Sequence, residues 1–229
     1  MRLLLASGLL FFLTGNPAFA QFDEDQLGGW YTYQWTLNRS QSTVGWQGDL
    51  QLRYWDVGGD TEQRLLRSGV TWQPGRIKYT LGFAHVVSEA FGRSTANSEE
   101  LRLYQEALWP AQRIGERGFL VHRVRTEERQ LEGQDLRTRA RYLIGYNHVL
   151  NQNSLGRGAL YLAFSNEIFV NLERGIGGGR RVDHFDRNRF AAGMGYSLTD
   201  GLRLQLSWMR QSLANSHKDQ LQLNLIHTF

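Results

Sequence analysis

The feature that most constrains this chain is a two-residue alternation of apolar and polar side chains that recurs along nearly its whole length. Successive side chains of a β-strand point to opposite faces, so this alternation predicts strands with one apolar and one polar face. Eleven such runs are bounded by turn residues, at 29–37, 43–56, 63–73, 76–87, 98–109, 118–129, 135–149, 157–172, 186–198, 201–213 and 219–229. Most span about ten residues or more, the length that a tilted strand needs to cross a bilayer.

The first twenty residues have a different character. Met1-Arg2 is a short positive segment, Leu3 to Leu13 is almost continuously apolar, and Ala18-Phe19-Ala20 is a small-x-small cleavage site. These features predict a signal peptide over 1–20 that is removed before Gln21, and so an exported chain. No later stretch holds the roughly 20 apolar residues of a transmembrane helix without a charge. If the mature chain enters a membrane, it must therefore form a closed barrel, because lipid offers open strand edges no hydrogen-bond partner.

One face of the runs carries large apolar and aromatic side chains, which we expect to contact lipid. They are Tyr31, Tyr33, Trp35, Trp46, Leu50, Leu52, Tyr54, Ile77, Tyr79, Leu81, Phe83, Tyr142, Ile144, Tyr146, Leu160, Leu162, Phe164, Ile168, Phe190, Met194, Tyr196, Leu202, Leu204, Leu206 and Trp208. The same face could instead pack against a second sheet in a soluble sandwich, but such a core would favour Val and Ile, whereas Leu, Tyr and Trp dominate here. The pattern favours an all-β, antiparallel transmembrane barrel over residues 21–229, with Tyr and Trp in girdles at the two membrane interfaces.

The connections between the runs are of two kinds. Residues 73–76 and 199–201 form compact turns, whereas 88–97 and 173–185 are long and polar. Short turns at one end and longer loops at the other are typical of an outer-membrane barrel. Single-chain bacterial barrels close with an even number of strands. Eleven runs therefore predict ten strands, with 29–37 outside the ring, or twelve, with one strand unrecognised.

The run at the C-terminus indicates the same class of protein. Leu221, Leu223, Leu225, His227 and Phe229 share one face, and mainly polar residues occupy the other. An alternation that ends in an aromatic residue resembles the closing strand of Gram-negative outer-membrane barrels. The resemblance implies that Phe229 belongs to the signal read by the barrel assembly machinery, and that the protein lies among the lipids of the bacterial outer membrane. An edge strand of a soluble sandwich is the alternative interpretation.

The polar face carries most of the charge. Ten arginines and one lysine are counted as pointing into the barrel: Arg53, Arg67, Lys78, Arg102, Arg123, Arg125, Arg137, Arg139, Arg141, Arg189 and Arg203. Arg129 and Arg187 continue the same face of their strands. Five acidic residues share this face: Asp49, Glu100, Glu106, Glu127 and Glu167. The interior is therefore expected to hold a surplus of about six positive charges.

This surplus has two interpretations. An arginine-lined channel would form a narrow passive pore for small anionic solutes, because guanidinium groups bind carboxylate and phosphate and a ring of one sign sets selectivity. Alternatively, neighbouring Arg and Glu strands pair and fill a narrow barrel, which would then act as a structural or interaction protein through its loops. Some pairing is required in either case, since bare buried charge is costly.

Short motifs in a fixed order carry a family resemblance. They are Glu100-x-Arg102-x-x-Gln105, Arg123-x-Arg125-x-Glu127-x-Arg129, Asn166-Glu167-x-Phe169 and Asp186-x-Asn188-Arg189-x-x-x-Gly193-x-Gly195-Tyr196. Together they resemble a group of small bacterial outer-membrane proteins of unknown function, over nearly the whole mature chain. The resemblance implies a secreted barrel embedded in the membrane and no established activity. Size and interior charge also resemble, more weakly, narrow porins that pass acidic oligosaccharides along arginine-lined tracks.

Enzymatic chemistry has little support in the sequence. A lipid hydrolase needs a histidine within hydrogen-bond reach of its serine nucleophile. Ser216 and His217 are adjacent and would point to opposite faces of a strand, or lie in a loop before the last strand. His85 falls on the lipid face while Ser88 falls in a loop. We therefore expect no enzyme, and a lipid-modifying enzyme is the least favoured alternative.

Cofactors and nucleic acid are not expected either. The chain has no cysteine, and its six histidines are dispersed, so no spacing indicates a metal site. Asp183, Asp186 and Asn188 could offer oxygen ligands to calcium. The arginines at 180, 181 and 187 beside them favour salt bridges instead. The formal charge of +4 is mild, and the arginines of the chain are scattered singly and do not form a basic run. The expected export is a second argument against a nucleic-acid partner.

Overall fold

The computed structural model of the protein describes residues 26–38, 42–91 and 97–229, and its regular secondary structure there is entirely β. The strands are β1 (Gly28–Asn38), β2 (Val44–Tyr54), β3 (Thr61–Trp72), β4 (Lys78–Glu89), β5 (Asn97–Ile114), β6 (Gly118–Leu131), β7 (Arg137–Val149), β8 (Leu160–Asn171), β9 (Phe185–Ser197), β10 (Leu202–Ser212) and β11 (His217–Thr228). Each overlaps one of the expected runs, with bounds that differ by up to five residues. Within these residues no helix is long and apolar enough to cross a membrane. The expected signal peptide, residues 1–20, lies outside the described residues.

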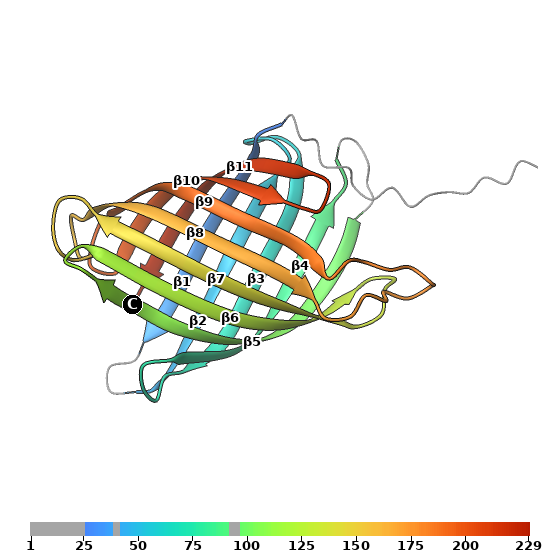
Figure 1. The fold of residues 1–229 in the computed structure, drawn as a ribbon, viewed down its shortest axis with the longest axis horizontal. Helices are drawn as coiled ribbons and strands as arrows, with labels where there is room; N and C mark the ends of the chain where they lie inside the picture. Colours follow the sequence, from blue (N-terminus) through green and yellow to red (C-terminus); the bar gives the residue numbers. More distant parts are fainter. Residues whose placement is uncertain (1–25, 39–41, 92–96) are drawn as a thin grey trace, which may run out of the picture.

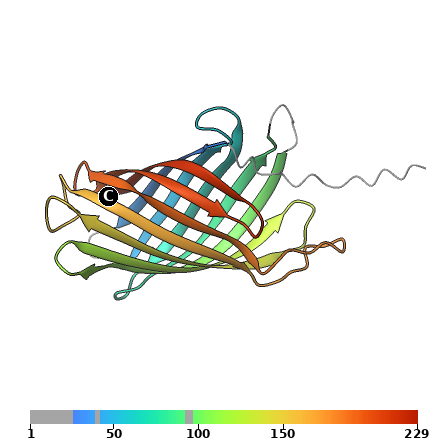
Figure 2. The ribbon, with the colours of Figure 1, turned by 45° about the horizontal axis from the view of Figure 1, so that its top comes forward.

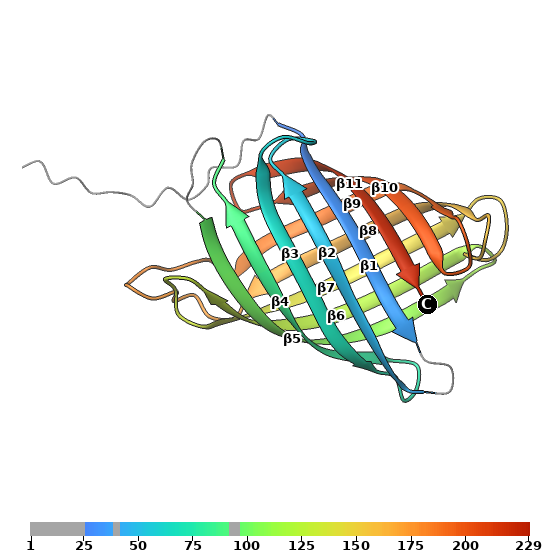
Figure 3. The same ribbon diagram turned by 180° about the vertical axis from the view of Figure 1, so that it is seen from behind.

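The strands form a closed barrel in which β1 pairs with β11. All neighbours are antiparallel except these two, which run parallel from Gly28↔Gln220 to Thr36↔Thr228. Figure 3 shows β1 and β11 side by side with their arrowheads pointing the same way. The expectation of ten or twelve strands is therefore wrong: the described chain closes with eleven, and its first run belongs to the ring. An odd number closes only through one parallel pair, because alternating directions give the first and last strands the same sense.

The two ends of the barrel carry different connections (Figures 1 and 2). One end, here called the Gly28 end, carries the long 172–184 connection, and the opposite end, the Phe229 end, carries the tight turns at 73–77 and 198–201. This contrast confirms the expected pattern. The ten-residue connection 150–159 departs from it, because it lies at the Phe229 end.

The expected loop at 88–97 is only partly confirmed. Ser88 and Glu89 complete β4 and Asn97 begins β5, so the hairpin strands are longer than the sequence pattern indicated. Residues 92–96 of that loop lie outside the described part of the chain.

Side-chain exposure follows the expected alternation. On β4, Leu81 is 59% exposed, whereas Thr80 and Ala84 are buried. On β7, exposed Tyr142 follows buried Arg141. The barrel therefore has an apolar, aromatic outer face and an inner face rich in arginine and glutamate.

A small apolar cluster lies at the Phe229 end. It consists of buried Val149, Ala159, Tyr161 and Ala163, with Phe119 and Leu155 packed against them. Hydrogen bonds to β9 and to the 198–201 turn are among those that hold the 150–159 connection in place. The Ser197 hydroxyl donates to the Leu155 carbonyl at 2.8 Å, and the Arg157 amide donates to Asp200 at 2.9 Å.

Gly195 provides the space that the Tyr161 ring occupies. A Cβ at position 195 would lie 2.1 Å from Cζ of Tyr161, which pairs with it across β8 and β9. We expect Gly195→Ala to destabilise the barrel by about 1–3 kcal/mol, the usual cost of overpacking. Gly75→Ala is the control, because a methyl group there meets nothing within 4 Å. Unfolding in detergent measures both variants, and equal stabilities would contradict this packing.

Two bulges turn acidic side chains inward. The register shifts at Arg53/Tyr54 opposite Glu62, and at Phe169/Val170 opposite Asp186. A bulge sets two residues of one strand against one of its partner and so interrupts the alternation. Asp186 consequently accepts a hydrogen bond from an interior arginine, although strict alternation would place it on the outer face.

Candidate functional site

The barrel encloses a cavity of about 400 Å³. Its lining includes Ser88, the penultimate residue of β4 near the Gly28 end, and Ile226, near the Phe229 end of β11. A second cavity of about 230 Å³, toward the Phe229 end, shares Arg67 and Arg123 with the first. The interior therefore holds two neighbouring cavities, and the lining of the first includes residues near both ends of the barrel.

The wall formed by β5 to β8 is held together by buried ion pairs. Glu127 accepts hydrogen bonds from Arg139 at 2.6 Å and from Arg141 at 2.5 Å. Arg141 also pairs with Glu167 at 2.7 Å, and Arg123 reaches Glu167 from two strands away at 2.5 Å. The remaining pairs are Glu106 with Arg123 and Arg125, Glu100 with Arg102 and Arg129, and Asp186 with Arg139 and Arg187. Each of these carboxylates contacts at least two guanidiniums, which offsets the cost of burying the charges.

The wall formed by β1, β10 and β11 presents uncharged polar side chains to the same cavity. They are Thr32, Gln34, Gln205, Gln211, Gln220, Gln222 and Asn224. Among the described residues, no carboxylate of these three strands lines the cavity. The cavity consequently lies between a wall rich in guanidinium groups and a wall rich in amides.

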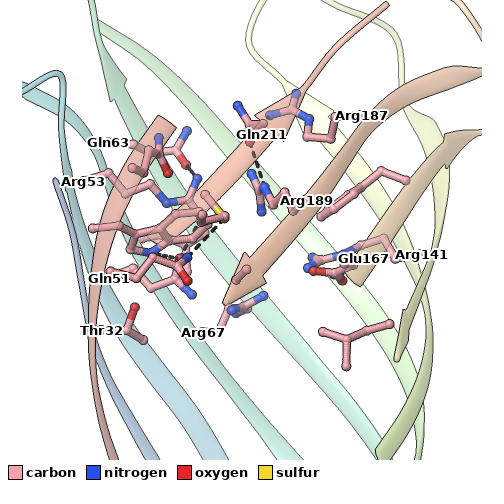
Figure 4. A pocket seen from close by; sticks show the side chains of 18 of the residues that line it. Thr32, Gln51, Arg53, Gln63, Arg67, Arg141, Glu167, Arg187, Arg189 and Gln211 are labelled. Carbon is pink, nitrogen blue, oxygen red and sulfur yellow. Dashed lines mark hydrogen bonds and ion pairs between the residues drawn. The ribbon is translucent and has the colours of Figure 1, made fainter. Parts of the chain in front are cut away.

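Two of the nine arginines that line the main cavity differ from the other seven, because amides hold them in place of carboxylates. Arg53 donates to Oε1 of Gln51 at 2.7 Å, and Arg189 donates to Oε1 of Gln211 at 2.7 Å. Both guanidiniums lie over the indole ring of Trp30, at 3.7 Å and 4.8 Å from a ring centroid. Within the described ranges, neither has a carboxylate oxygen within 4.0 Å. Figure 4 shows both arginines and their amide partners inside the barrel.

The structure brings the sequence-predicted residues together in this interior. The main cavity is lined by Arg53, Arg67, Arg102, Arg123, Arg139, Arg141, Glu167 and Arg189. Arg125 and Lys78 line the second cavity, and Glu127 is buried in the ion-pair network. Arg137 is buried near the Gly28 end, and Arg203 shares the face of Gln205 near the Phe229 end. Phe229 is exposed beside the His227 ring, and its part in assembly stays a prediction.

Three interior charges were missed by the sequence interpretation. Glu62 and Asp186 are turned inward by bulges, which alternation does not reveal. Lys218 was expected in a loop, but β11 already begins at His217, and the buried Lys218 ammonium lies 3.5 Å from Glu62 and over the ring of Trp55. Its position two residues before Gln220 is the signal that could have placed it on the inner face.

The histidine–serine candidates do not form catalytic pairs. His85 lies on the outer face, 3.2 Å from Glu99, whereas Ser88 lines the interior and accepts a hydrogen bond from Gln63. The expected loop position of His217 is wrong, because this residue begins β11 and is exposed there. Ser216 lies in the preceding turn.

The calcium candidates do not converge either. Asp183 lies 3.5 Å from Arg174, Asp186 pairs with Arg187 at 3.1 Å, and Asn188 donates to Asn166 at 3.0 Å. Salt bridges with Arg180, Arg181 and Arg187 were the favoured interpretation, and the structure confirms one for Asp186 with Arg187, whereas Asp183 pairs with Arg174. In the part of the chain that the structure describes, no group of three or more His, Asp or Glu side chains could hold a metal ion.

Comparison with models of protein families shows the family to which the chain belongs. The family model described as a protein of unknown function, DUF2490, matches residues 27–222. The chain belongs to this family. The DUF2490 match begins just before β1 and ends within β11, so it includes both walls of the cavity. The resemblance to a family without known function is therefore confirmed. No curated protein and no solved structure matches this DUF2490 chain significantly.

Proposed function

We propose that this barrel spans a bacterial outer membrane and provides a narrow passive passage for small anionic solutes, without a catalytic step. The observation that carries the proposal is the main cavity, which lies between the guanidinium wall and the amide wall. Nine arginines and three glutamates line it. A passing anion therefore meets many charged donors, whereas a cation meets few free carboxylates, since most carboxylates already pair with guanidiniums.

The outer face supports a membrane location. Large apolar side chains such as Val70, Leu101 and Leu206 are about half exposed or more. Exposed apolar surface that surrounds a whole molecule indicates a lipid environment. Toward the Gly28 end, this apolar belt gives way to outer-face ion pairs, Arg64–Glu89 and Arg210–Asp219.

Aromatic side chains mark the other edge of the apolar belt. Trp46, Trp72, Tyr79 and Tyr196 are exposed on the outer face toward the Phe229 end. Tyr and Trp concentrate at membrane interfaces, because their rings are apolar and their N–H or O–H groups remain hydrated. The belt therefore has the boundaries that a bilayer requires.

Planar-bilayer recording tests the passage. The reversal potential of the wild-type barrel in a salt gradient is expected to report anion preference. Gln222→Glu places a carboxylate on the amide wall and is expected to lower that preference about fivefold, since a unit charge 4 Å from an ion contributes about 1 kcal/mol even in water. Gln130→Glu makes the same change on the outer surface of β6 and serves as the control. Cation preference in the wild type would refute the proposal.

A second candidate function is a structural barrel that works through its loops. It is favoured by the buried ion pairs of β5 to β8, in which charged side chains satisfy one another across neighbouring strands. A folded barrel that inserts into the bilayer but conducts no ions would support this candidate over the passage.

A further inference from the structure

The charges of Arg53 and Arg189 are not neutralised by the groups that position them. Arg53 donates through Nη1 to Gln63 and through Nη2 to Gln51, and both acceptors are amide oxygens. Its Nε is buried and has no hydrogen-bond partner among the described residues. Arg189 donates through Nε alone, to Gln211. An amide oxygen accepts a hydrogen bond but adds no negative charge, so each guanidinium keeps its full positive charge inside the barrel.

The amides are themselves fixed. Gln51 donates from Nε2 to Asp49 at 2.8 Å and accepts from the indole N–H of Trp30 at 3.1 Å. Gln63 donates from Nε2 to Ser88 at 2.7 Å. Because their amino groups are committed to other partners, these amides must point their oxygens at Arg53. The arginine is therefore held ready in one orientation, which lowers the entropic cost of binding a ligand.

The two arginines contact the same aromatic ring. Arg53 and Arg189 come from β2 and β9, yet both guanidiniums lie over the ring of Trp30. Arg189 also lies over the Phe169 ring, at 4.7 Å from its centroid. Figure 4 shows Arg187, which shares Gln211 with Arg189, at the same place in the cavity. Aromatic faces attract cations, but they do not neutralise them.

We propose that Arg53 and Arg189 bind a small dianion with charged oxygen atoms, of which inorganic phosphate is the simplest, at a fixed point in the cavity. This site would lie within the proposed passage. It rests on the proposed function, because a solute from outside must be able to enter the cavity. Two guanidiniums that no carboxylate oxygen of the described residues contacts within 4.0 Å match two negative charges. One tetrahedral oxyanion offers enough oxygens for both, whereas a monoanion leaves one guanidinium unpaired. Uncompensated buried charge is costly, so the apo barrel favours uptake of such an anion.

Calorimetric titration of the folded barrel in detergent tests the site, at mildly alkaline pH, where inorganic phosphate is mainly a dianion. Wild type is expected to bind phosphate. Arg53→Gln and Arg189→Gln are each expected to weaken binding about tenfold or more, because each removes charged hydrogen bonds to the ligand. Arg64→Gln removes the same charge from the outer face, where Arg64 pairs with Glu89, and is expected to bind as wild type does. Acetate at matched ionic strength is expected to bind more weakly than phosphate.

A stability measurement separates a binding role from a structural one. Without phosphate, Arg189→Gln is expected to unfold at a temperature no lower than wild type, since it removes a charge that has no compensating carboxylate. A clear drop would make Arg189 a structural residue and overturn the proposal. Equal phosphate binding by all four proteins, or none by wild type, would also overturn it.

Conductance measurements on the same preparations distinguish the phosphate site from the anion passage. Anion conduction without phosphate binding would leave the passage intact and overturn the site. Phosphate binding without conduction would support the site and refute the passage.

Discussion

Glu127→Gln is expected to lower the free energy of unfolding of the barrel by about 3–5 kcal/mol, the usual cost of removing one partner from a buried ion pair. The Glu127 side chain is 1% exposed and lies 2.6 Å from Arg139, 2.5 Å from Arg141 and 3.7 Å from Arg125. An amide of the same shape removes the negative charge among these three guanidiniums, which then repel one another. Chemical unfolding from lipid vesicles, followed by tryptophan fluorescence, measures the change.

The control is an ion pair on the outer face. Glu89 pairs with Arg64 at 2.5 Å, but their side chains are 26% and 56% exposed. Glu89→Gln is therefore expected to cost about 1 kcal/mol or less, as exposed ion pairs usually do. Equally small losses in both variants would mean that water screens the interior charges, and the structural barrel would lose its main support. A large loss for Glu127→Gln alone would show that β5 to β8 form a dry, rigid wall.

The strands and their faces could be predicted from the sequence because each depends on local alternation. Leu206 and Gln205, for example, fall on opposite faces simply because they are neighbours in a strand. The same rule assigned Arg125, Arg139 and Arg141 to the interior, where the structure places them. The wall of a barrel is a single β-sheet, so every side chain points either outward or inward. Local periodicity is therefore enough to separate the outer face from the inner face.

Closure and bulges could not be predicted in this way. The parallel pairing of β1 with β11 joins Gly28 to Gln220, and nothing in the periodicity of either strand specifies that partner. A bulge changes the face of one residue without changing the composition around it. Asp186 therefore looked like a residue of the outer face, or a calcium ligand, until its contact with Arg139 was known.

The distinction among the arginines also required the structure. Arg141 and Arg189 have the same position in the alternation, but Arg141 meets Glu127 and Arg189 meets Gln211. Which side chain an arginine meets depends on the register between strands, and Arg123 reaches across β7 to Glu167. Sequence could therefore predict a positive interior, but it could not identify which two of the arginines that line the main cavity, Arg53 and Arg189, have no carboxylate oxygen of the described residues within 4.0 Å.

Leu206→Arg is expected to reduce the stability of the membrane-inserted barrel by about 2–4 kcal/mol, the range for an arginine on the lipid face near the bilayer midplane. Leu206 is 51% exposed on β10, and its paired neighbours Met194 and Leu223 are exposed apolar side chains as well. An arginine there would have to extend away from this apolar surface to reach water or phosphate headgroups. Folding into lipid vesicles, followed by the shift in gel mobility between folded and unfolded barrel, measures the loss.

Leu136→Arg provides the control, because Leu136 is 60% exposed but lies in the connection between β6 and β7 at the Gly28 end. By exposure alone, the two substitutions should be equally harmless, within about 0.5 kcal/mol of wild type. They differ only if the middle of the outer face contacts lipid while the connection contacts water. If both variants fold and remain as stable as wild type, the apolar belt is not embedded in a bilayer, and a passage across the outer membrane is refuted with it. A loss confined to Leu206→Arg would place the belt in lipid independently of any conductance.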